Sequence, residues 1–483
     1  MKLNLIDIIL RLSVFLLLLS GFIVPTFAAS LPPTYERPRV IVTTDGEADD
    51  RCSMIRFLLT SNEFEVEAII NSSSQFHWVG GQGWHAFHPV EWVKEQIDLY
   101  AQVYPNLTLH DKNYPSPDYL LSKWKIGNIK AAGESDERTQ GAEFIAQILL
   151  DETDSRPVWI QAWGGTNTIA KALKIIQSEH PEKMQTVANK MRLFLIWEQD
   201  QTYQEYIRPH WEHLNVLTII SDQFDSMAYI WPKVLPAEIK PYFEAPWMQT
   251  HILQNHGPLA AAYEALNGAF HAEGDTPAFL HTIPTGLANL ENPNWGGWGG
   301  RYVHVRHNVW MDPPPADNWK HPDGRRTIDN SWAKKFENVT DPDMVKLRTQ
   351  YFKPIWRWLD TVQNDFAARA DWSVKPYAEA NHHPVIKLSN TQLNIQAKAG
   401  QVISLDASQS YDPDGDKLSY KWWFYAEASD YQGSEIAPIN QAIANFTVPR
   451  DAKNGDEIHL ICEVADSGKP KLVKYQRIIV NVI

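Results

Sequence analysis

Three aspartates follow a strongly apolar segment near the start of the chain. Residues 40–43 are all β-branched and predict a strand, and Asp45, Asp49 and Asp50 come before an amphipathic stretch at 51–59 that predicts a helix. Carboxylates this close in sequence repel one another unless a cation, a proton or a helix N-terminus compensates their charge. Calcium fits best, because it takes about six to eight oxygen ligands and accepts carboxylates from a single loop.

A simpler interpretation also exists for these residues. Asp49 and Asp50 could cap the following helix and interact favourably with its dipole. Capping explains one aspartate fully but not three. We therefore favour a metal site, although any short motif carries a risk of false matches.

Alternating strand-like and helix-like segments surround this motif from Arg39 to about Asp371. Such alternation predicts a mostly parallel sheet flanked by helices, in which ligands bind at the carboxyl ends of the strands. Further strands are expected at 66–70, 158–162, 193–197 and 216–220, and helices at 139–150, 168–177 and 342–368, the last kinked at Pro354. Residues 313–326 are polar and proline-marked, which predicts a surface loop.

The composition changes near residues 373–384, which we take as a linker. Short alternating strands separated by turn residues follow, which is the pattern of a small all-β, immunoglobulin-like sandwich. They are expected at 385–388, 401–405, 418–424, 444–448, 457–464 and 475–482. The predicted domains are thus 37–372 and 384–483.

The first 29 residues have the pattern of an export signal. Lys2 and Arg11 precede an apolar run, Pro25 interrupts it, and the small residues Ala28 and Ala29 offer a cleavage site. The apolar core is short for a bilayer span, so a cleaved signal peptide is favoured over a permanent anchor. The protein is therefore expected to be secreted, extracellular or periplasmic, with no membrane span after cleavage.

Net charge and composition restrict the kinds of binding partner that are expected. The net charge is −14, which argues against nucleic-acid polymers, whose phosphates the surface would repel. The chain has 20 tryptophans, an abundance that fits stacking on sugars, although bulky core residues must account for most of them. Cys52 and Cys462 stand far apart in the chain and are expected to be free thiols. The oligomeric state cannot be predicted.

The aspartate motif resembles that of the nucleoside hydrolase superfamily, a strand followed by Asp-x-Asp-Pro-Gly-x-Asp-Asp. Two later segments agree in order with this family. They are Trp163-Gly-Gly-Thr-Asn-Thr-Ile-Ala170, after a predicted strand, and Gly274-Asp-Thr-Pro-Ala-Phe-Leu280. More specifically, the chain resembles secreted, nucleoside-hydrolase-like proteins described as cellulose-binding, which carry a C-terminal β-sandwich. The segments 39–50, 274–287 and 294–302 carry that resemblance.

The resemblance implies roles for individual residues. Asp45, Asp50 and Asp275, with the backbone carbonyl of Thr166, would bind calcium. Asp45 would also act as the base for a bound water, and Asp49 would contact sugar hydroxyls. Asn167 is a further candidate for substrate binding. A helix cap remains open as an alternative for Asp275, and for Thr166 or Asn167.

The chain also departs from the superfamily pattern. Thr43 stands where the first aspartate is expected, and Gly46-Glu47 replaces Pro-Gly. Gly274 stands where some members carry a histidine proposed as the leaving-group acid. Metal binding is therefore expected to be retained, whereas specificity for purine or pyrimidine ribosides does not follow.

Two aromatic loops could contact a ligand. Trp295 and Trp298 lie among glycines and could form a flat platform for a sugar or base, or could equally pin the loop to the core. His77 lies in a second aromatic loop, 75–85, after the second predicted strand, where it could act as an acid or a sugar contact, although a solvated loop histidine is the commoner case.

Two functions remain in competition at this stage. One is a calcium-dependent hydrolase of N-glycosyl or related glycosidic bonds, acting on a nucleoside-like small molecule or a carbohydrate. The other is a non-catalytic protein that binds cellulose or another polysaccharide, which the missing acid and Thr43 favour. Nothing specific supports a third possibility, an adhesion module.

Overall fold

The computed structural model describes residues 37–389 and 392–483. The predicted signal peptide, residues 1–29, lies outside the described residues. Within them, residues 37–483 form one compact unit. No helix in this described part is both long enough and apolar enough to cross a membrane.

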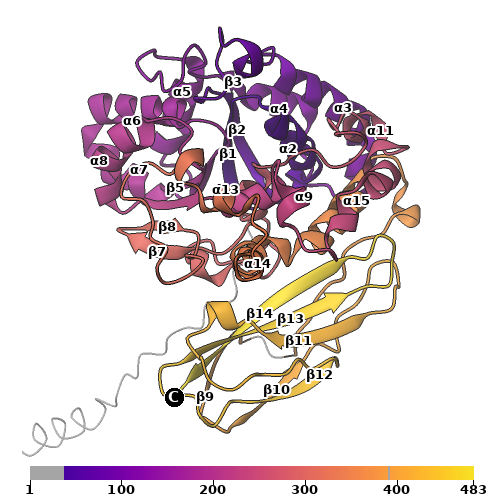
Figure 1. Ribbon diagram of the computed structural model, residues 1–483. Helices are drawn as coiled ribbons and strands as arrows, with labels where there is room; N and C mark the ends of the chain where they lie inside the picture. Colours follow the sequence, from indigo (N-terminus) through magenta and orange to yellow (C-terminus); the bar gives the residue numbers. More distant parts are fainter. Residues whose placement is uncertain (1–36, 390–391) are drawn as a thin grey trace, which may run out of the picture. The chain divides into compact units, whose positions relative to one another are not determined.

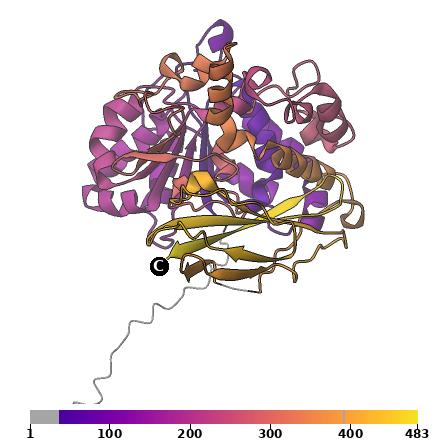
Figure 2. The same ribbon diagram turned by 60° about the horizontal axis from the view of Figure 1, so that its bottom comes forward.

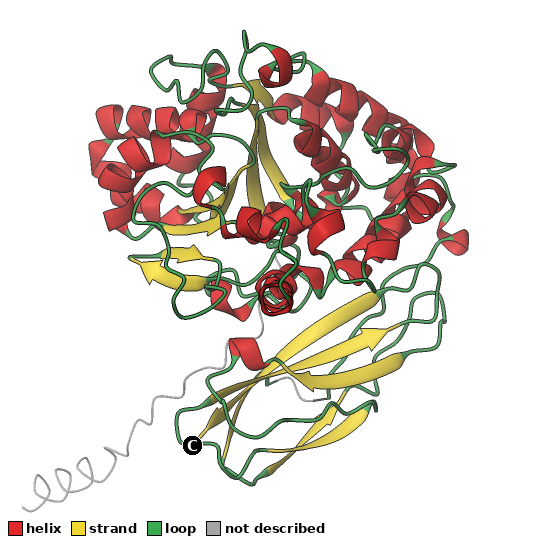
Figure 3. Cartoon of the chain, viewed as in Figure 1, coloured by secondary structure: helices red, strands yellow, loops and turns green. Residues whose placement is uncertain are grey.

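An eight-stranded sheet is the centre of the larger, N-terminal part (Figures 1 and 3). All its neighbouring strands run parallel except the last pair, β8 and β7, which is antiparallel. In spatial order the strands are β3 (Trp124–Ile126), β2 (Glu65–Asn71), β1 (Arg39–Thr44), β4 (Val158–Ala162), β5 (Met191–Ile196), β6 (Leu217–Ser221), β8 (Val309–Met311) and β7 (Val303–Arg306). The prediction of a mostly parallel sheet flanked by helices is confirmed.

Helices cover both faces of this sheet, as Figure 1 shows. Side chains of the two faces belong to two separate hydrophobic clusters, in which Val40 and Val42 of β1 belong to one and Ile41 to the other. This alternation is what a strand buried on both sides requires. The principal helices are α2 (Ala48–Leu59), α3 (Trp92–His110), α4 (Pro117–Lys123), α5 (Gln140–Leu150), α6 (Asn167–Glu179), α7 (Met184–Lys190), α12 (Thr276–Leu280), α13 (Trp332–Phe336), α14 (Pro342–Trp356) and α15 (Leu359–Trp372).

The strand order changes direction at β1. Strands β2 and β3 lie on one side of it, and β4, β5 and β6 lie on the other. At such a switch point the loops that follow the two central strands diverge and leave a crevice for ligands. Asp45 follows β1 and Thr166 follows β4, so the fold places two of the predicted ligands at this point.

The helix predicted over 342–368 is wrong in one respect, because it is two helices. α14 ends at Trp356 and α15 begins at Leu359, and Pro354 lies in the last turn of α14. Proline removes a backbone donor and its ring crowds the preceding turn. The helix therefore ends shortly after Pro354 rather than continuing with a kink.

The C-terminal part is all β, in two sheets (Figure 2). One sheet pairs β10 (Val402–Asp406) with β12 (Ile443–Thr447), and the other has the order β11 (Ser419–Phe424), β13 (Glu457–Ala465), β14 (Val473–Val482) and β9 (Asn394–Ala397). Five of the six predicted strands are present. The sixth, 385–388, forms only an isolated bridge between Val385 and Tyr411, whereas β9, which pairs in parallel with β14, was not predicted.

The predicted linker, residues 373–384, is packed against its surroundings. The His382 ring stacks on Tyr377 at 3.8 Å between centroids, and the His383 imidazole lies 3.0 Å from the Asp365 carboxylate. Further along the chain, Arg477 of β14 donates through Nε to the carbonyl of Leu287 at 2.8 Å. Side-chain contacts thus join the all-β part to the α/β part, in addition to the covalent connection between them.

Candidate functional site

Four buried aspartates converge at the carboxyl end of β1, and we call them the acidic cluster: Asp45, Asp49, Asp50 and Asp275. Asp49, Asp50 and Asp275 each offer a carboxylate oxygen, and these atoms all lie within 4.8 Å of one another. Asp45 joins them through its backbone N–H, which donates to Asp50 Oδ1 at 3.2 Å. Residues more than 200 positions apart in the chain thus meet because β1 ends where α12 begins.

The capping alternative does not describe these side chains. Glu47 is the N-cap of α2, and its side chain makes no capping hydrogen bond. Asp50 instead accepts from the hydroxyl of Thr44. Asp275 is the N-cap residue of α12, yet its side chain also makes no capping bond. Side-chain capping hydrogen bonds therefore do not account for these carboxylates, although Asp49 and Asp50 do lie in the first turn of α2, where the helix dipole favours acidic residues.

Two oxygens of the cluster have no partner among the described residues. They are Oδ2 of Asp45 and Oδ2 of Asp275, both fully buried atoms. A buried acceptor without a donor costs about 1–3 kcal/mol, and more when it is charged. A cation bound between these oxygens would remove that cost.

Burial changes the proton affinity of the whole cluster. Desolvation, followed by repulsion from Glu47, raises the pKa of Asp45 to about 7. Desolvation and the neighbouring carboxylates also raise the pKa of Asp49, Asp50 and Asp275 well above the usual range. Without a cation, these buried carboxyl groups are harder to ionise than usual. A hard divalent cation such as calcium would favour their charged form, because it binds carboxylate oxygens.

Thr166 is held at the neighbouring strand end by a glycine turn. A Cβ on Gly164 would lie 2.8 Å from Cβ of Asp45, and one on Gly165 would lie 2.2 Å from Oδ2 of Asp200. Only glycine therefore allows the turn after β4 to approach both aspartates. The Thr166 hydroxyl donates to Asp200 at 3.3 Å, and its carbonyl accepts from Ala170 N–H at 2.8 Å. Among the hydrogen bonds of the described residues, none joins Thr166 to the acidic cluster.

Asn167 is fully buried and bound to other loops. Its Nδ2 donates to Ser73 Oγ at 2.9 Å and to the carbonyl of Asn128 at 2.7 Å, while its backbone N–H donates to Asp200 at 3.0 Å. Only Oδ1 has no partner among the described residues. The amide of Asn167 is thus used chiefly to hold the rim of the site.

His77 lies at the edge of the acidic cluster. Its Nε2 is 3.4 Å from Oε2 of Glu47, and Tyr229 donates its hydroxyl to Oε1 of Glu47 at 2.8 Å. Burial lowers the pKa of His77, but the contact with Glu47 outweighs burial, so the pKa is raised overall. The structure therefore places an imidazole of raised pKa beside the Glu47 carboxylate.

Comparison with known proteins identifies the family. The model of the family described as "Cellulose-binding Sde182, nucleoside hydrolase-like domain" matches residues 39–302. The model described as "Cellulose-binding protein Sde0182, C-terminal domain" matches residues 402–482.

This chain belongs to the cellulose-binding, nucleoside hydrolase-like family.

One solved structure agrees with this assignment. A nucleoside hydrolase-related protein from Saccharophagus degradans, described as associated with carbohydrate metabolism, is 31% identical with a TM-score of 0.72, and the match covers 93% of this chain and 100% of that one. A plant nucleoside hydrolase and a purine-preferring ribonucleoside hydrolase from Gardnerella vaginalis are each 12% identical with TM-scores of 0.28, covering 66% of this chain and 99% of theirs. Their likeness is too low to support any argument about substrate. No curated protein matches the chain.

Gly274 lies against the acidic cluster. A Cβ at this position would lie 2.5 Å from Oδ2 of Asp49 and 3.3 Å from the Phe224 ring. A larger residue here would therefore require the Asp49 carboxylate to move.

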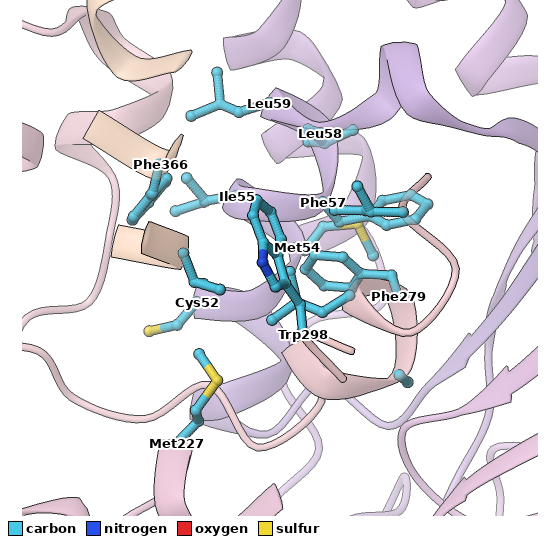
Figure 4. Close-up of a cluster of buried hydrophobic side chains, with 14 of the residues drawn as sticks. Cys52, Met54, Ile55, Phe57, Leu58, Leu59, Met227, Phe279, Trp298 and Phe366 are labelled. Atoms are coloured by element: carbon cyan, nitrogen blue, oxygen red, sulfur yellow. The ribbon is translucent and has the colours of Figure 1, made fainter. Parts of the chain in front are cut away.

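The two tryptophans of the glycine loop pack against other side chains of the protein. Trp298 is only 3% exposed and belongs to the same hydrophobic cluster as Met54, Phe57 and Phe279 (Figure 4). Trp295 is half-buried, with its ring 5.2 Å from that of His459 in the all-β part. This arrangement matches the alternative of a loop pinned to the core, and Trp298 has no free face for a sugar.

Trp84 is the exposed tryptophan that the sequence did not single out. All 20 tryptophans lie in the described residues, and only Trp84, at 64%, is exposed. It stacks on His85 with ring centroids 3.7 Å apart and meets the His77 ring edge-on at 6.2 Å. The same short loop thus carries an exposed indole and the histidine that reaches Glu47.

Glu47, Asp200 and Tyr229 are further parts of the site that sequence reasoning missed. Glu47 stands inside the aspartate motif, and Asp200 follows β5 as Asp45 follows β1, so strand-end position could have indicated both. Tyr229 comes from an irregular segment after β6 and carries no sequence signal. Cys52 and Cys462 are buried free thiols, as expected. Burial raises the pKa of Cys462 to about 12.

Proposed function

We propose that this protein is a calcium-dependent hydrolase of N-glycosyl or related glycosidic bonds that works while attached to polysaccharide. The observation that carries the proposal is the acidic cluster, with two buried carboxylate oxygens that no described residue pairs. Calcium would be held by Asp45, Asp50, Asp275 and the carbonyl of Thr166. When bound, such an ion orients sugar hydroxyls and makes a water molecule more acidic.

The chain's own residues supply the remaining steps. Asp45 would accept a proton from the attacking water, because a carboxylate positioned beside a bound water can act as a general base. Asp49 would accept hydrogen bonds from sugar hydroxyls. The oxocarbenium-like state of glycosyl cleavage is positive, so a buried set of carboxylates is complementary to it.

His77 is the candidate for the leaving-group acid in place of residue 274. It lies within 3.4 Å of Glu47, which favours its protonated form. A protonated imidazole beside the cluster can donate to a departing oxygen or nitrogen. A His77→Gln variant is expected to lower kcat by about 100-fold with a small change in KM, which steady-state kinetics would measure.

Trp84 would provide the contact with polysaccharide. Sugar rings stack on flat exposed indoles, and Trp84 is the exposed tryptophan of the chain. A Trp84→Ala variant is expected to weaken retention on insoluble cellulose by about tenfold while leaving the free energy of unfolding within about 0.5 kcal/mol of the parent. Trp298→Phe is the matched control, because that indole is buried and should not affect retention.

A panel experiment tests the hydrolase. The mature protein is incubated with nucleosides and aryl glycosides, with calcium and with a chelator, beside Asp50→Ala. Turnover that requires both calcium and Asp50 is expected. Turnover that survives in both the chelated and the variant samples would contradict a role for the acidic cluster.

A second function is favoured by one specific observation, the glycine at position 274, where a larger side chain such as a histidine acid would require the Asp49 carboxylate to move. A protein without that acid could bind polysaccharide through the cluster and Trp84 and perform no hydrolysis. No turnover on any substrate, combined with calcium-dependent retention on cellulose, would support this binder over the hydrolase.

Export is part of the proposal. Cellulose lies outside cells, and the family is described as cellulose-binding. Cleavage after Ala28 or Ala29 remains a prediction, and N-terminal sequencing of the exported protein would test it.

A further inference from the structure

A cavity lies apart from the acidic cluster. It has a volume of about 110 Å³ and is bordered by the proline run after β8, by α14, and by Tyr425 and Glu427 of the all-β part. None of the four aspartates of the acidic cluster lines it. Ligand sites for drug-sized molecules usually measure roughly 300–1,000 Å³, so this cavity suits one small ring or group rather than a polymer segment.

A buried acceptor without a partner lines this cavity. Gln223 is 1% exposed, and its Nε2 donates to the carbonyl of Tyr351 at 2.8 Å. Its Oε1 has no hydrogen-bond partner among the described residues. A buried amide oxygen in this state is destabilising unless a donor reaches it. A hydroxyl group of a ligand in the cavity would supply that donor.

An unpaired donor lines the same cavity. The guanidinium of Arg301 donates through Nη1 to the side chain of Asn294, while its buried Nε has no partner among the described residues. Burial lowers the pKa of Arg301, and attraction to Glu427 does not restore it. A carboxylate is the group that best compensates an arginine in this position, because it accepts from the guanidinium and carries the opposite charge.

Positive charge exceeds negative charge around the cavity. Glu427 is the single acidic side chain that lines it, and it is already paired with Lys353 at 2.6 Å and with Arg357 at 3.3 Å. Three cations, Arg301, Lys353 and Arg357, thus face one carboxylate, and no salt bridge is found for Arg301 among the described residues. An excess of cations at one cavity is notable in a chain whose net charge is −14.

The walls between these polar groups are apolar. Pro313, Pro315 and Pro354 line the cavity, as does Tyr425, whose ring is stacked under the Arg357 guanidinium at 4.6 Å. Apolar and aromatic walls suit the C–H faces of a sugar ring. The unpaired acceptor, the cation and the apolar walls are together complementary to a molecule with hydroxyl groups, a carboxylate and one small ring.

We propose that this cavity binds an acidic sugar, a hexuronic acid, with its carboxylate facing Arg301 and a ring hydroxyl donating to Oε1 of Gln223. The site is separate from the acidic cluster and requires no hydrolysis. It would give a polysaccharide-associated protein a second, charge-selective contact with uronate-containing chains.

Isothermal titration of the mature protein with glucuronate tests this proposal, beside glucose, which lacks the carboxylate, and propionate, which lacks the hydroxyls. Glucuronate is expected to bind at least tenfold more tightly than either. Arg301→Gln should weaken glucuronate binding by at least tenfold, and Gln223→Met should weaken it several-fold. Arg301→Lys, which keeps the charge, should retain part of the affinity.

Asp275→Asn separates this site from the calcium site. Uronate binding that survives in Asp275→Asn and is lost in Arg301→Gln supports the proposal, whatever the outcome of the hydrolase experiment. The opposite pattern would show that the carboxylate binds at the calcium site, and would overturn it. Equal affinity for propionate and glucuronate would also overturn it, because a plain anion site needs no sugar. If Arg301→Gln fails to fold, Gln223→Met decides between these outcomes.

Discussion

Two regions of this protein bury aspartates at the ends of sheet strands. In one region the protein's own donors compensate the negative charge, and in the other they do not. Asp222, after β6, accepts hydrogen bonds from Trp197 Nε1 at 2.7 Å, Tyr351 Oη at 2.6 Å and Arg326 Nη2 at 2.8 Å. Further donors to it are the hydroxyl of Ser331 and the backbone N–H groups of Trp332 and Ala333. Within residues 37–389 and 392–483, no arginine or lysine bonds to the acidic cluster in this way, and two of its oxygens have no hydrogen-bond partner.

The proton affinities follow from this difference. Burial alone would raise the pKa of Asp222, but Arg326 and the hydroxyl donors outweigh it, so the pKa is lowered. In the acidic cluster burial is not outweighed, and the pKa of Asp45 is raised to about 7. A carboxylate compensated from inside the protein stabilises the fold, whereas one left uncompensated is suited to receiving a cation from outside.

The largest expected effect separates the two regions by stability. Asp222→Asn removes the nearer of two buried carboxylates from Arg326 and leaves only Asp312, at 3.8 Å, so the free energy of unfolding should fall by about 3–5 kcal/mol. Urea unfolding followed by tryptophan fluorescence would measure this loss. A loss below about 1 kcal/mol would mean that Asp222 is not the structural counterpart described here.

An intermediate loss of stability is expected from a substitution at Gly165, in the turn that follows β4. Gly165→Ala places a methyl group within 2.2 Å of Asp200 Oδ2 and 2.5 Å of the Ser73 carbonyl. Such overpacking should cost about 1–3 kcal/mol and displace Thr166. Calcium-dependent stabilisation should weaken in parallel, measured by thermal unfolding with and without calcium. Gly324→Ala, at a position where a Cβ meets nothing within 4 Å, is the matched control.

The smallest expected effect is a gain, rather than a loss, in the free energy of unfolding. In the presence of a chelator, Asp275→Asn should raise the free energy of unfolding by about 1 kcal/mol, because it removes one of several repelling, desolvated carboxylates. The folded-state pKa of Asp45 is raised from 3.8 to about 7, so the metal-free protein loses stability as the pH rises through this range. The advantage of Asp275→Asn should therefore be small at pH 4 and grow towards pH 7. An advantage that is constant with pH would contradict the electrostatic explanation.

Strand-end position and the order of three segments predicted that Asp45, Asp50 and Asp275 would lie at one edge of the sheet. The structure brings the carboxylates of Asp49, Asp50 and Asp275 together, and Asp45 is bonded to Asp50 through its backbone N–H. The parallel sheet followed from the alternation of segments.

Other features depend on packing, which local sequence does not specify. Trp298 and Trp84 both stand next to glycines, yet one is 3% and the other 64% exposed. Tyr229 reaches Glu47 from a segment with no regular structure, and the break between α14 and α15 follows Pro354 rather than bending there. In each case long-range contacts decide what the local pattern leaves open.

Direct titration of calcium into chelator-treated protein tests the central claim. We expect one calcium ion per chain, with no measurable binding to Asp275→Asn or Asp50→Ala and unchanged binding to Trp84→Ala. Calorimetric heats that are absent in the parent protein, or identical in the parent and Asp275→Asn, would show that these four aspartates do not form a calcium site.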